Sequence, residues 1–313
     1  MTERIGEFDV IARHFRPLAA PAGRDLTDDA AVFLPPPGRE LVVSSDCIVA
    51  GVHFFPDDPA DAIAQKLLRV NLSDLAAMGA EPLYYTLCLS IPAATPDEWI
   101  ARFAQGLAAD QKNFGIALIG GDTTSTPGPI SLSLTIFGHV APGAAIGRNG
   151  ARPGDLILVT GTIGDAALGL EVSLGKLADS SGYLRERYLR PSPRMEVARA
   201  ELVHACIDLS DGLIQDIGHL ARNSGVEANV FAQRIPLSDA ARAHPADFTG
   251  GDDYELAMAV APENVAALAA HAAQLGVEIT VIGEFQLGSG QVIVLDADGR
   301  DVTPQKGGWS HLA

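Results

Sequence analysis

Aspartate recurs in six short motifs spread along the whole chain, most of them led by glycine or small polar residues. The motifs are Thr27-Asp28-Asp29, Ser44-Ser45-Asp46, Asn71-Leu72-Ser73-Asp74, Gly120-Gly121-Asp122, Asp208-Leu209-Ser210-Asp211 and Gly250-Gly251-Asp252-Asp253. Where a fold brings several such carboxylates together, they repel one another and their pKa values rise. Mg²⁺ relieves this repulsion, because it takes oxygen ligands and shares carboxylates with the phosphates of a substrate. The motifs therefore predict metal-dependent phosphate chemistry.

The length and composition are those of a globular protein with more than one domain. The 313 residues exceed the size at which a single core stops growing, so we expect two domains. The hydrophobic fraction of 47% and the charged fraction of 19% exclude a disordered chain. The formal net charge of −17 repels nucleic acid and anionic membranes, so we expect neither as a partner.

The cysteines and the N-terminal residues bear on the cellular compartment of the protein. Cys47, Cys88 and Cys206 are far apart and form no Cys-x-x-Cys pair, which supports neither a disulfide framework nor a zinc site. The first residues lack the apolar core of a secretory signal, and no apolar run is long enough to span a membrane. We therefore expect a cytoplasmic protein.

Hydrophobic periodicity predicts mixed strands and helices in the first half. Residues 41–43 read as a strand that delivers Ser44-Ser45-Asp46 at its tip, and residues 59–78 as a helix carrying Asn71 and Asp74 one turn apart. Further strands are expected at 83–91, 116–119 and 130–140, with a helix at 96–113. The second of these strands runs into Gly120-Gly121-Asp122.

A stretch rich in glycine and proline, residues 141–154, marks the expected domain boundary and gives domains 1–141 and 142–313. Ser210 is expected to be the N-cap of a helix that contains Leu213, Ile217 and Leu220, with Asp211 in its first turn. Strands are expected at 156–160, 255–261, 279–282 and 292–295, and helices at 165–175 and 262–275. Both halves are therefore α+β.

Each motif alone has an ordinary structural explanation. Gly120-Gly121-Asp122 is equally typical of a tight turn and of a close approach to phosphate. Asp208 to Asp211 can be a helix cap or an anion site at a helix N-terminus. Asp28-Asp29 and Asp252-Asp253 can be solvated loop charges. Neither a Walker P-loop nor a Gly-x-Gly-x-x-Gly motif is present.

Read in order, the motifs resemble those of the thiamine-monophosphate kinase family over nearly the whole chain. The resemblance is carried by Asp28-Asp29-Ala30-Ala31, Ser44-Ser45-Asp46 with Gly51-Val52-His53-Phe54, residues 71–79, residues 120–124, residues 190–193, residues 207–213 and residues 250–256. That family belongs to the aminoimidazole ribonucleotide synthetase superfamily. The resemblance implies two α/β domains, an N-terminal ATP- and Mg-binding domain whose sheet forms a homodimer, and a C-terminal domain that completes the active site.

The resemblance also implies a transferase that converts thiamine monophosphate to thiamine diphosphate with ATP as co-substrate and several Mg²⁺ ions. The implied metal ligands are Asp29, Ser44, Ser45, Asp46, Asp74, Asp122, Asp208 and Asp211, and of these Asp46 and Asp74 would be catalytic through the metals. The implied ATP contacts are Gly121, Asp122, Arg148 and Ser210, and the implied thiamine-side contacts are His53, Asp252 and Trp309. Thr27, Ser45 and Asp252 stand where the family often has Gly, Thr and Glu.

The acceptor would be a phosphate monoester, which is largely a dianion at neutral pH because its second pKa is about 6. No general base is then needed, and direct in-line transfer between Mg²⁺-bridged substrates is expected. Three alternatives remain at this point: a synthetase of the superfamily acting on an amide, a non-catalytic nucleotide or thiamine-phosphate sensor, and an acidic structural protein. Relatives that make selenophosphate or mature hydrogenase are expected to carry a reactive cysteine, and this chain ends Trp309-Ser-His-Leu-Ala313.

Overall fold

The computed structural model describes residues 6–244 and 249–310. The chain divides into two compact units. The N-terminal unit comprises the residues up to Leu75 together with Glu81–Gly143, and the C-terminal unit comprises Ala76–Ala80 together with the residues from Ala144 onward. None of the helices in the described ranges has the length and apolar composition needed to cross a membrane.

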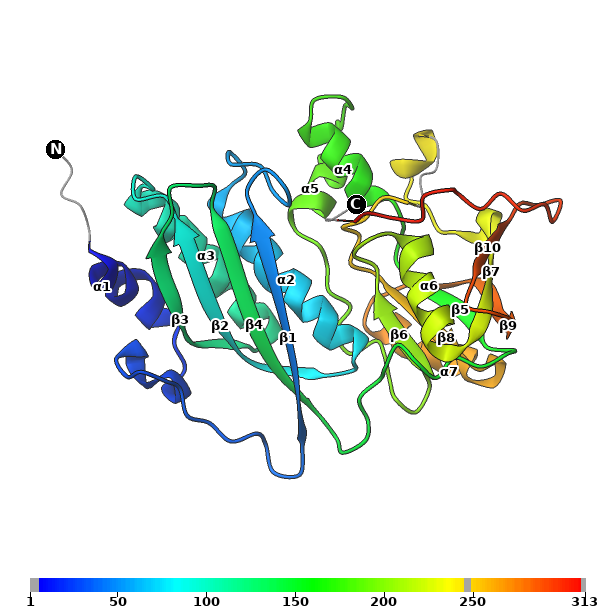
Figure 1. Cartoon of the computed structure of the whole chain (residues 1–313), viewed down its shortest axis with the longest axis horizontal. Helices are drawn as coiled ribbons and strands as arrows, with labels where there is room; N and C mark the ends of the chain where they lie inside the picture. The colour runs from blue at the N-terminus through cyan, green and yellow to red at the C-terminus, as the bar shows by residue number, and fades with distance from the viewer. Residues whose placement is uncertain (1–5, 245–248, 311–313) are drawn as a thin grey trace. The chain divides into compact units, whose positions relative to one another are not determined.

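The N-terminal unit is built on a four-stranded sheet in the order β1-β4-β2-β3 (Figure 1). Its strands are β1 (Glu40–Val49), β2 (Glu81–Ile91), β3 (Ala117–Ser125) and β4 (Ser131–Val140). Strand β4 pairs antiparallel with both β1 and β2, and β3 pairs parallel with β2. The parallel pair requires a crossover, which is supplied by the helix between these strands.

Two long helices, α2 (Ala60–Ala77) and α3 (Asp97–Phe114), cover one face of this sheet. Leu132, Leu134 and Ile136 alternate along β4 and are fully buried, which marks the face that packs on the helices. Helix α3 begins with Asp97 and Glu98 after Pro96 and ends at Gly115 in the left-handed conformation, as its sequence predicts. Before β1 lie the short helix α1 (Glu7–Val10) and further helical turns up to Leu26.

The C-terminal unit contains a six-stranded sheet in the order β10-β7-β9-β5-β8-β6. Its strands are β5 (Leu156–Thr160), β6 (Ala205–Asp208), β7 (Val226–Phe231), β8 (Leu256–Val260), β9 (Ile279–Leu287) and β10 (Val292–Leu295). All neighbours are antiparallel except β10 and β7. The helices are α4 (Asp165–Ser173), α5 (Tyr183–Leu189), α6 (Leu213–Ser224) and α7 (Val265–Gln274).

This second sheet is buried on both faces. Ile157 and Val159 of β5 join a cluster with Leu213 and Leu220 of α6. Leu158, which points to the opposite face, joins a cluster that includes Leu268 of α7. The sheet therefore has helices on both sides, and the predicted α+β class is confirmed for the two units.

The structure corrects three local expectations. Strand β1 continues to Val49, so Ser44, Ser45 and Asp46 lie within the strand and not at its tip. Strand β3 likewise continues through Gly120-Gly121-Asp122 to Ser125, so this motif is not a turn. A Cβ at Gly121 would lie 1.8 Å from the carbonyl oxygen of Leu87, which explains why glycine is required inside the strand pair.

The third correction concerns the start of α6. The N-cap position is held by Gly212, with φ of 131°, and the helix begins at Leu213, so Ser210 is not the cap and Asp211 is not in the first turn. Strands β6 and β7 and helix α5 were not predicted from the sequence. All four residues of strand β6 are buried, so the strand shows no alternation of apolar and polar side chains.

The close contact between α2 and α3 can be tested at Gly106, where a Cβ would lie 2.3 Å from the carbonyl oxygen of Asp61. We expect Gly106→Ala to lower the free energy of unfolding by roughly 1–3 kcal/mol, because the backbones would have to separate. Urea denaturation measures this change. Gly128→Ala is the control, since its added methyl would make only an ordinary contact at 3.5 Å. Equal stability of the two variants would contradict the prediction.

Candidate functional site

A pair of carboxylates lies between the sheet and helix α2 in the N-terminal unit. Ser44 and Asp46 pair with the buried residues Ile136 and Leu134 of β4, so their side chains point to the helix-covered face. Asp74 comes from α2, and its Oδ2 accepts a hydrogen bond of 2.5 Å from the Ser44 hydroxyl. The strand period and the helix therefore bring two of the predicted motifs together.

Electrostatics at this pair favour a proton or a cation. Burial, followed by the charge of Asp74 and a hydrogen bond with it, raises the pKa of Asp46 to about 6. Asn71 joins this local network: its side-chain oxygen accepts the Asp46 backbone N–H at 3.1 Å, and its amide donates to Leu67 O at 2.8 Å. Asn71 thus holds β1 against α2 from within the same helix that supplies Asp74.

Ser45 and Asp122 lie on the opposite face of the same sheet. Ser45 pairs with Thr135, and its hydroxyl contacts the Thr135 hydroxyl at 3.0 Å. Asp122 pairs with Cys88 of β2, two positions along the sheet from the residues that pair with Ser45 and therefore on the same face. The predicted ligands in the N-terminal sheet therefore lie on two faces, because successive side chains of a strand point to opposite sides.

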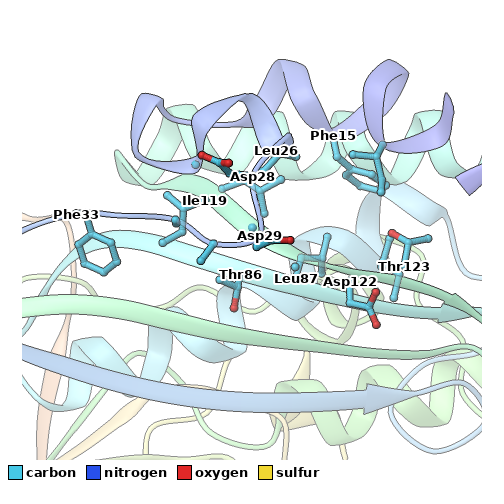
Figure 2. Close-up of a pocket in the computed structure, with 18 of the residues that line it drawn as sticks. Phe15, Leu26, Asp28, Asp29, Phe33, Thr86, Leu87, Ile119, Asp122 and Thr123 are labelled. Atoms are coloured by element: carbon cyan, nitrogen blue, oxygen red, sulfur yellow. The ribbon is translucent and has the colours of Figure 1, made fainter. Parts of the chain in front are cut away.

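A cavity of about 390 Å³ opens on this second face, and Figure 2 shows the side chains around it. Asp29, Gly121 and Asp122 line it, together with apolar side chains that include Phe15 and Leu26. Asp29 and Asp122 come from distant parts of the sequence and reach the same cavity. An apolar wall beside two exposed carboxylates is a chemically mixed site, suited to a ligand with both a flat apolar part and a polar part.

His53 lies in the turn that follows β1. Its Nδ1 accepts the backbone N–H of Val49 at 3.0 Å, so the ring proton of the neutral imidazole is on Nε2. The backbone oxygen of His53 accepts a hydrogen bond of 2.9 Å from the ammonium group of the buried Lys66. Both interactions fix the turn, and Lys66 was not singled out from the sequence.

Two aspartate motifs are joined by backbone hydrogen bonds in the C-terminal unit. The N–H of Asp252 donates to Ser210 O at 2.9 Å, and the N–H of Tyr254 donates to Leu209 O at 2.8 Å. These bonds extend the pairing of β6 with β8, in which Asp208 faces Leu256. The antiparallel pairing thus places the two motifs in contact although one ends at Asp211 and the other begins at Gly250.

Trp309 belongs to the same cluster. Its backbone N–H donates to Asp211 O at 2.9 Å. Gln215 of α6 links the two residues a second time, since its side-chain amide donates to Asp211 Oδ2 at 2.9 Å and to Trp309 O at 2.8 Å. Trp309 is 51% exposed, and the ammonium group of Lys306 lies 5.7 Å from the centre of its indole ring.

Asp216 is a residue of this cluster that sequence reasoning missed. Its carboxylate accepts the backbone N–H groups of Asp211 and Gly212, each at 3.1 Å, and so caps the start of α6. Burial raises the pKa of Asp216 to about 7, against the lowering effect of these donors and of the charge of Arg148. An acidic residue in the first turn of α6 was the available signal, and it explains why Ser210 is not needed as a cap.

The structure thus groups the predicted site residues within each unit. Asp46, Asp74 and Ser44 meet between β1 and α2, Asp29, Gly121 and Asp122 meet at the cavity, and Ser210, Asp211, Asp252 and Trp309 are linked in the C-terminal unit. Among the residues that the structure describes, no three His, Cys, Asp or Glu side chains are grouped so that they could hold a metal ion. A cation at the Asp46–Asp74 pair would therefore need further ligands such as water, hydroxyl or phosphate oxygens.

Two family models match the chain. Residues 27–140 match the N-terminal domain of AIR synthase related proteins, and residues 152–296 match the C-terminal domain of the same proteins. The two matches together cover most of the chain and fall in different units.

Curated and solved relatives agree with these matches. The thiamine-monophosphate kinase of Caulobacter vibrioides is 44% identical, over 97% of this chain and 90% of its own length. The crystal structure of thiamine-monophosphate kinase from Stenotrophomonas maltophilia K279a is 42% identical with a TM-score of 0.80, covering 88% of this chain and 90% of that one. A structure described as AaThiL complexed with AMPPCP and TMP is 28% identical with a TM-score of 0.77, covering 98% and 97%. The chain belongs to the thiamine-monophosphate kinase family.

Proposed function

We propose that this chain transfers the γ-phosphoryl group of ATP to thiamine monophosphate and releases thiamine diphosphate and ADP. The observation that carries the proposal is the 44% identity to a thiamine-monophosphate kinase over 97% of the chain. The related structure with AMPPCP, an analogue of ATP, and TMP bound supports the same pair of substrates. An amide-directed synthetase and a non-catalytic sensor lack comparable support.

Mg²⁺ is the cation that fits the carboxylate clusters. Burial and the neighbouring Asp74 raise the pKa of Asp46, and a divalent cation beside both carboxylates would reverse that effect. Bound there, such ions would supply positive charge that offsets the negative charge of the transferred phosphoryl group. The proposed ligands are Asp29, Ser44, Ser45, Asp46, Asp74, Asp122, Asp208 and Asp211.

The residues assigned to ATP lie in both units. Gly121 and Asp122 border the cavity of the N-terminal unit, and we assign its apolar wall, with Phe15 and Leu26, to the adenine base. Arg148 is exposed and Ser210 is half-buried in the C-terminal unit. The guanidinium of Arg148 suits a phosphate oxygen, because its donors match phosphate geometry.

The thiamine side is assigned to His53, Asp252 and Trp309. The Nδ1 atom of His53 accepts the Val49 N–H, so the neutral ring carries its proton on Nε2. Asp252 supplies a negative charge for the cationic thiazolium ring, and the half-exposed indole of Trp309 supplies an aromatic face for it. The two residues are tied to neighbouring positions of one loop, Ser210 and Asp211.

The chemistry needs positioning more than proton transfer. The acceptor phosphate is largely dianionic at neutral pH, so it is already a nucleophile. The residues of this chain then have to hold two anions in line and exclude competing water. We therefore propose direct in-line transfer without a general base.

We also propose a cytoplasmic homodimer formed through the open face of the N-terminal sheet, with domains bounded at 141 and 142. Leu41 and Val43 are exposed on the β1 side of that face, and Val43 is 55% exposed. Phe33 packs edge-on against Tyr84 and Phe137, at ring distances of 5.1 and 5.6 Å, and covers only part of it. Exposed apolar strand residues of this kind are typical of an interface.

The function is tested by incubating the purified protein with ATP, Mg²⁺ and thiamine monophosphate and measuring thiamine diphosphate and ADP. We expect both products from the wild type and a roughly 10²–10³-fold lower turnover from Asp74→Asn, because one charge that positions the metals is lost. Circular dichroism should show an intact fold. Asp239→Asn, at a fully exposed carboxylate, is the control. Absence of both products with the wild type would overturn the proposal, and wild-type activity of Asp74→Asn would overturn the role of Asp74.

The Asp46–Asp74 pair also predicts a pH dependence of stability in metal-free protein. The folded state binds the Asp46 proton more tightly than the unfolded state, since the pKa is raised from 3.8 to about 6. Stability should therefore fall by about 2 kcal/mol as the pH rises from about 4 to about 7, and Asp46→Asn should remove that component.

Chemical denaturation at several pH values in the presence of a chelator measures this component. Adding Mg²⁺ at pH 7 should stabilise the wild type more than Asp46→Asn, because the ion binds the folded state. If the free energy of unfolding changed equally with pH in the wild type and in Asp46→Asn, repulsion between Asp46 and Asp74 would not be its cause.

Dimerisation is tested at Val43. We expect the wild type to have twice the chain mass of 32.7 kDa in sedimentation experiments and Val43→Glu to be a monomer, since the added carboxylate would be buried without a partner. Leu287→Glu, at a residue 86% exposed in the C-terminal unit, should leave the dimer intact. A monomeric wild type, or a dimeric Val43→Glu, would contradict the proposed interface.

A further inference from the structure

The loop that carries Asp252 has a backbone that needs external support. Asp252 and Tyr254 have φ angles of 69° and 50°, in the left-handed region that residues other than glycine rarely adopt. Gly251 before them is also constrained, since a Cβ there would lie 2.3 Å from Ser210 O. Such conformations persist only where the surrounding structure fixes them, and they gather at ligand sites.

Asp253 anchors this loop to helix α4. Its carboxylate accepts the backbone N–H of Gly164 at 2.7 Å and that of Ala166 at 3.1 Å, at the first turn of the helix. The residue is only 2% exposed. Between two residues with left-handed backbone, the inward side chain of Asp253 therefore ties the loop to a fixed element.

Arg187 of α5 holds the same loop through its backbone. One guanidinium nitrogen, Nη2, donates to the carbonyl oxygen of Asp253 at 3.2 Å and to Glu255 Oε1 at 2.8 Å. Its Nε is buried without a hydrogen-bond partner and lies 4.0 Å from Asp165 Oδ2. A buried guanidinium with this geometry connects the loop to the strand that follows it.

Glu255 is itself held rigidly. It is fully buried, its Oε2 accepts the Thr160 hydroxyl at 2.6 Å, and Arg194 contacts both carboxylate oxygens, from Nε and Nη2, at 2.5 Å. A carboxylate bound by a two-pronged arginine has a defined direction as well as a defined place. We call Arg187, Arg194, Asp253 and Glu255 the loop anchor.

We infer that Arg187 and Asp253 are positioning residues, which set the place of Asp252 for the thiamine part of the substrate. The inference rests on the proposed function, because it takes Asp252 as a thiamine contact. Neither residue needs to touch the substrate: each acts through the loop backbone between Gly250 and Tyr254. The loop anchor gives a role to Arg187, Asp253 and Glu255, which are buried beside the start of β8, and to the half-buried Arg194.

Arg187→Lys tests the inference, because lysine keeps the charge but is shorter and lacks the guanidinium nitrogen, Nη2, that donates to both Asp253 O and Glu255 Oε1. We expect the KM for thiamine monophosphate to rise at least tenfold while the KM for ATP stays within twofold of the wild type. Asp253→Asn should give the same selective effect, since its amide N–H₂ opposes the N–H donors of α4. Arg199→Lys is the matched control, at a surface pair with Glu201 in the same unit.

Hydrogen exchange supplies a readout that does not require turnover. The amides of Asp252 and Tyr254 should exchange faster in Arg187→Lys than in Arg199→Lys, because their bonds to Ser210 O and Leu209 O depend on the loop anchor. If the wild type forms no thiamine diphosphate, the proposed function fails while the exchange result still reports on the loop.

Three results would overturn the inference. The first is unchanged exchange in both variants, and the second is an equal rise of both KM values, which would indicate a general structural role. The third is loss of the folded state in both Arg187→Lys and Asp253→Asn, which would show that the loop anchor holds the unit and not the loop.

Discussion

The burial of Asp46 against Asp74 is the constraint around which the N-terminal unit is arranged. A helix-covered sheet face is normally apolar, and a carboxylate placed there loses hydration that must be replaced. The Ser44 hydroxyl donates to Asp74 and replaces part of the hydration of that carboxylate, whereas Asn71 accepts the backbone N–H of Asp46 and fixes the strand against the helix. These groups do not neutralise the charge of the pair itself, and the pKa of Asp46 is raised accordingly.

The C-terminal unit brings loops from distant segments of the chain to one place. The pairing of β6 with β8 sets Asp208 opposite Leu256, and the backbone bonds from Asp252 and Tyr254 continue that ladder into the loops. The register of one short antiparallel pair therefore determines which motif residues meet. Trp309 joins them because the chain returns to Asp211 near its C-terminal end.

The sequence predicted the long elements and the identity of the motifs better than the local geometry of the motifs. Helices α2 and α3 and strand β4 have strong periodicity, and each was found close to its observed bounds. The Gly120-Gly121-Asp122 motif was expected at a strand end, but glycine there permits close approach to Leu87 of a parallel neighbour, which cannot be known without the sheet order.

The start of α6 shows a second limit of the same kind. Serine is a residue type that often caps helices, yet the start of α6 is capped by the side chain of Asp216 from within the helix. The backbone oxygen of Ser210 instead accepts the N–H of Asp252. By contrast, the side chain of Ser45 points to the face opposite those of Ser44 and Asp46 because successive strand residues alternate. This arrangement could be predicted from the sequence once all three residues are placed in one strand.

The distribution of charge favours cations taken from solution over a basic patch for anionic substrates. Several cationic side chains near the candidate sites are used to hold protein groups: Lys66 binds the His53 carbonyl, and Arg187 and Arg194 bind Glu255. The net charge of −17 repels free ATP but attracts divalent cations. ATP complexed with Mg²⁺ carries less negative charge and meets less of that repulsion. Under the proposed metal assignment, the acidic motifs would both attract the ions and hold them, which suits a reaction between two phosphates.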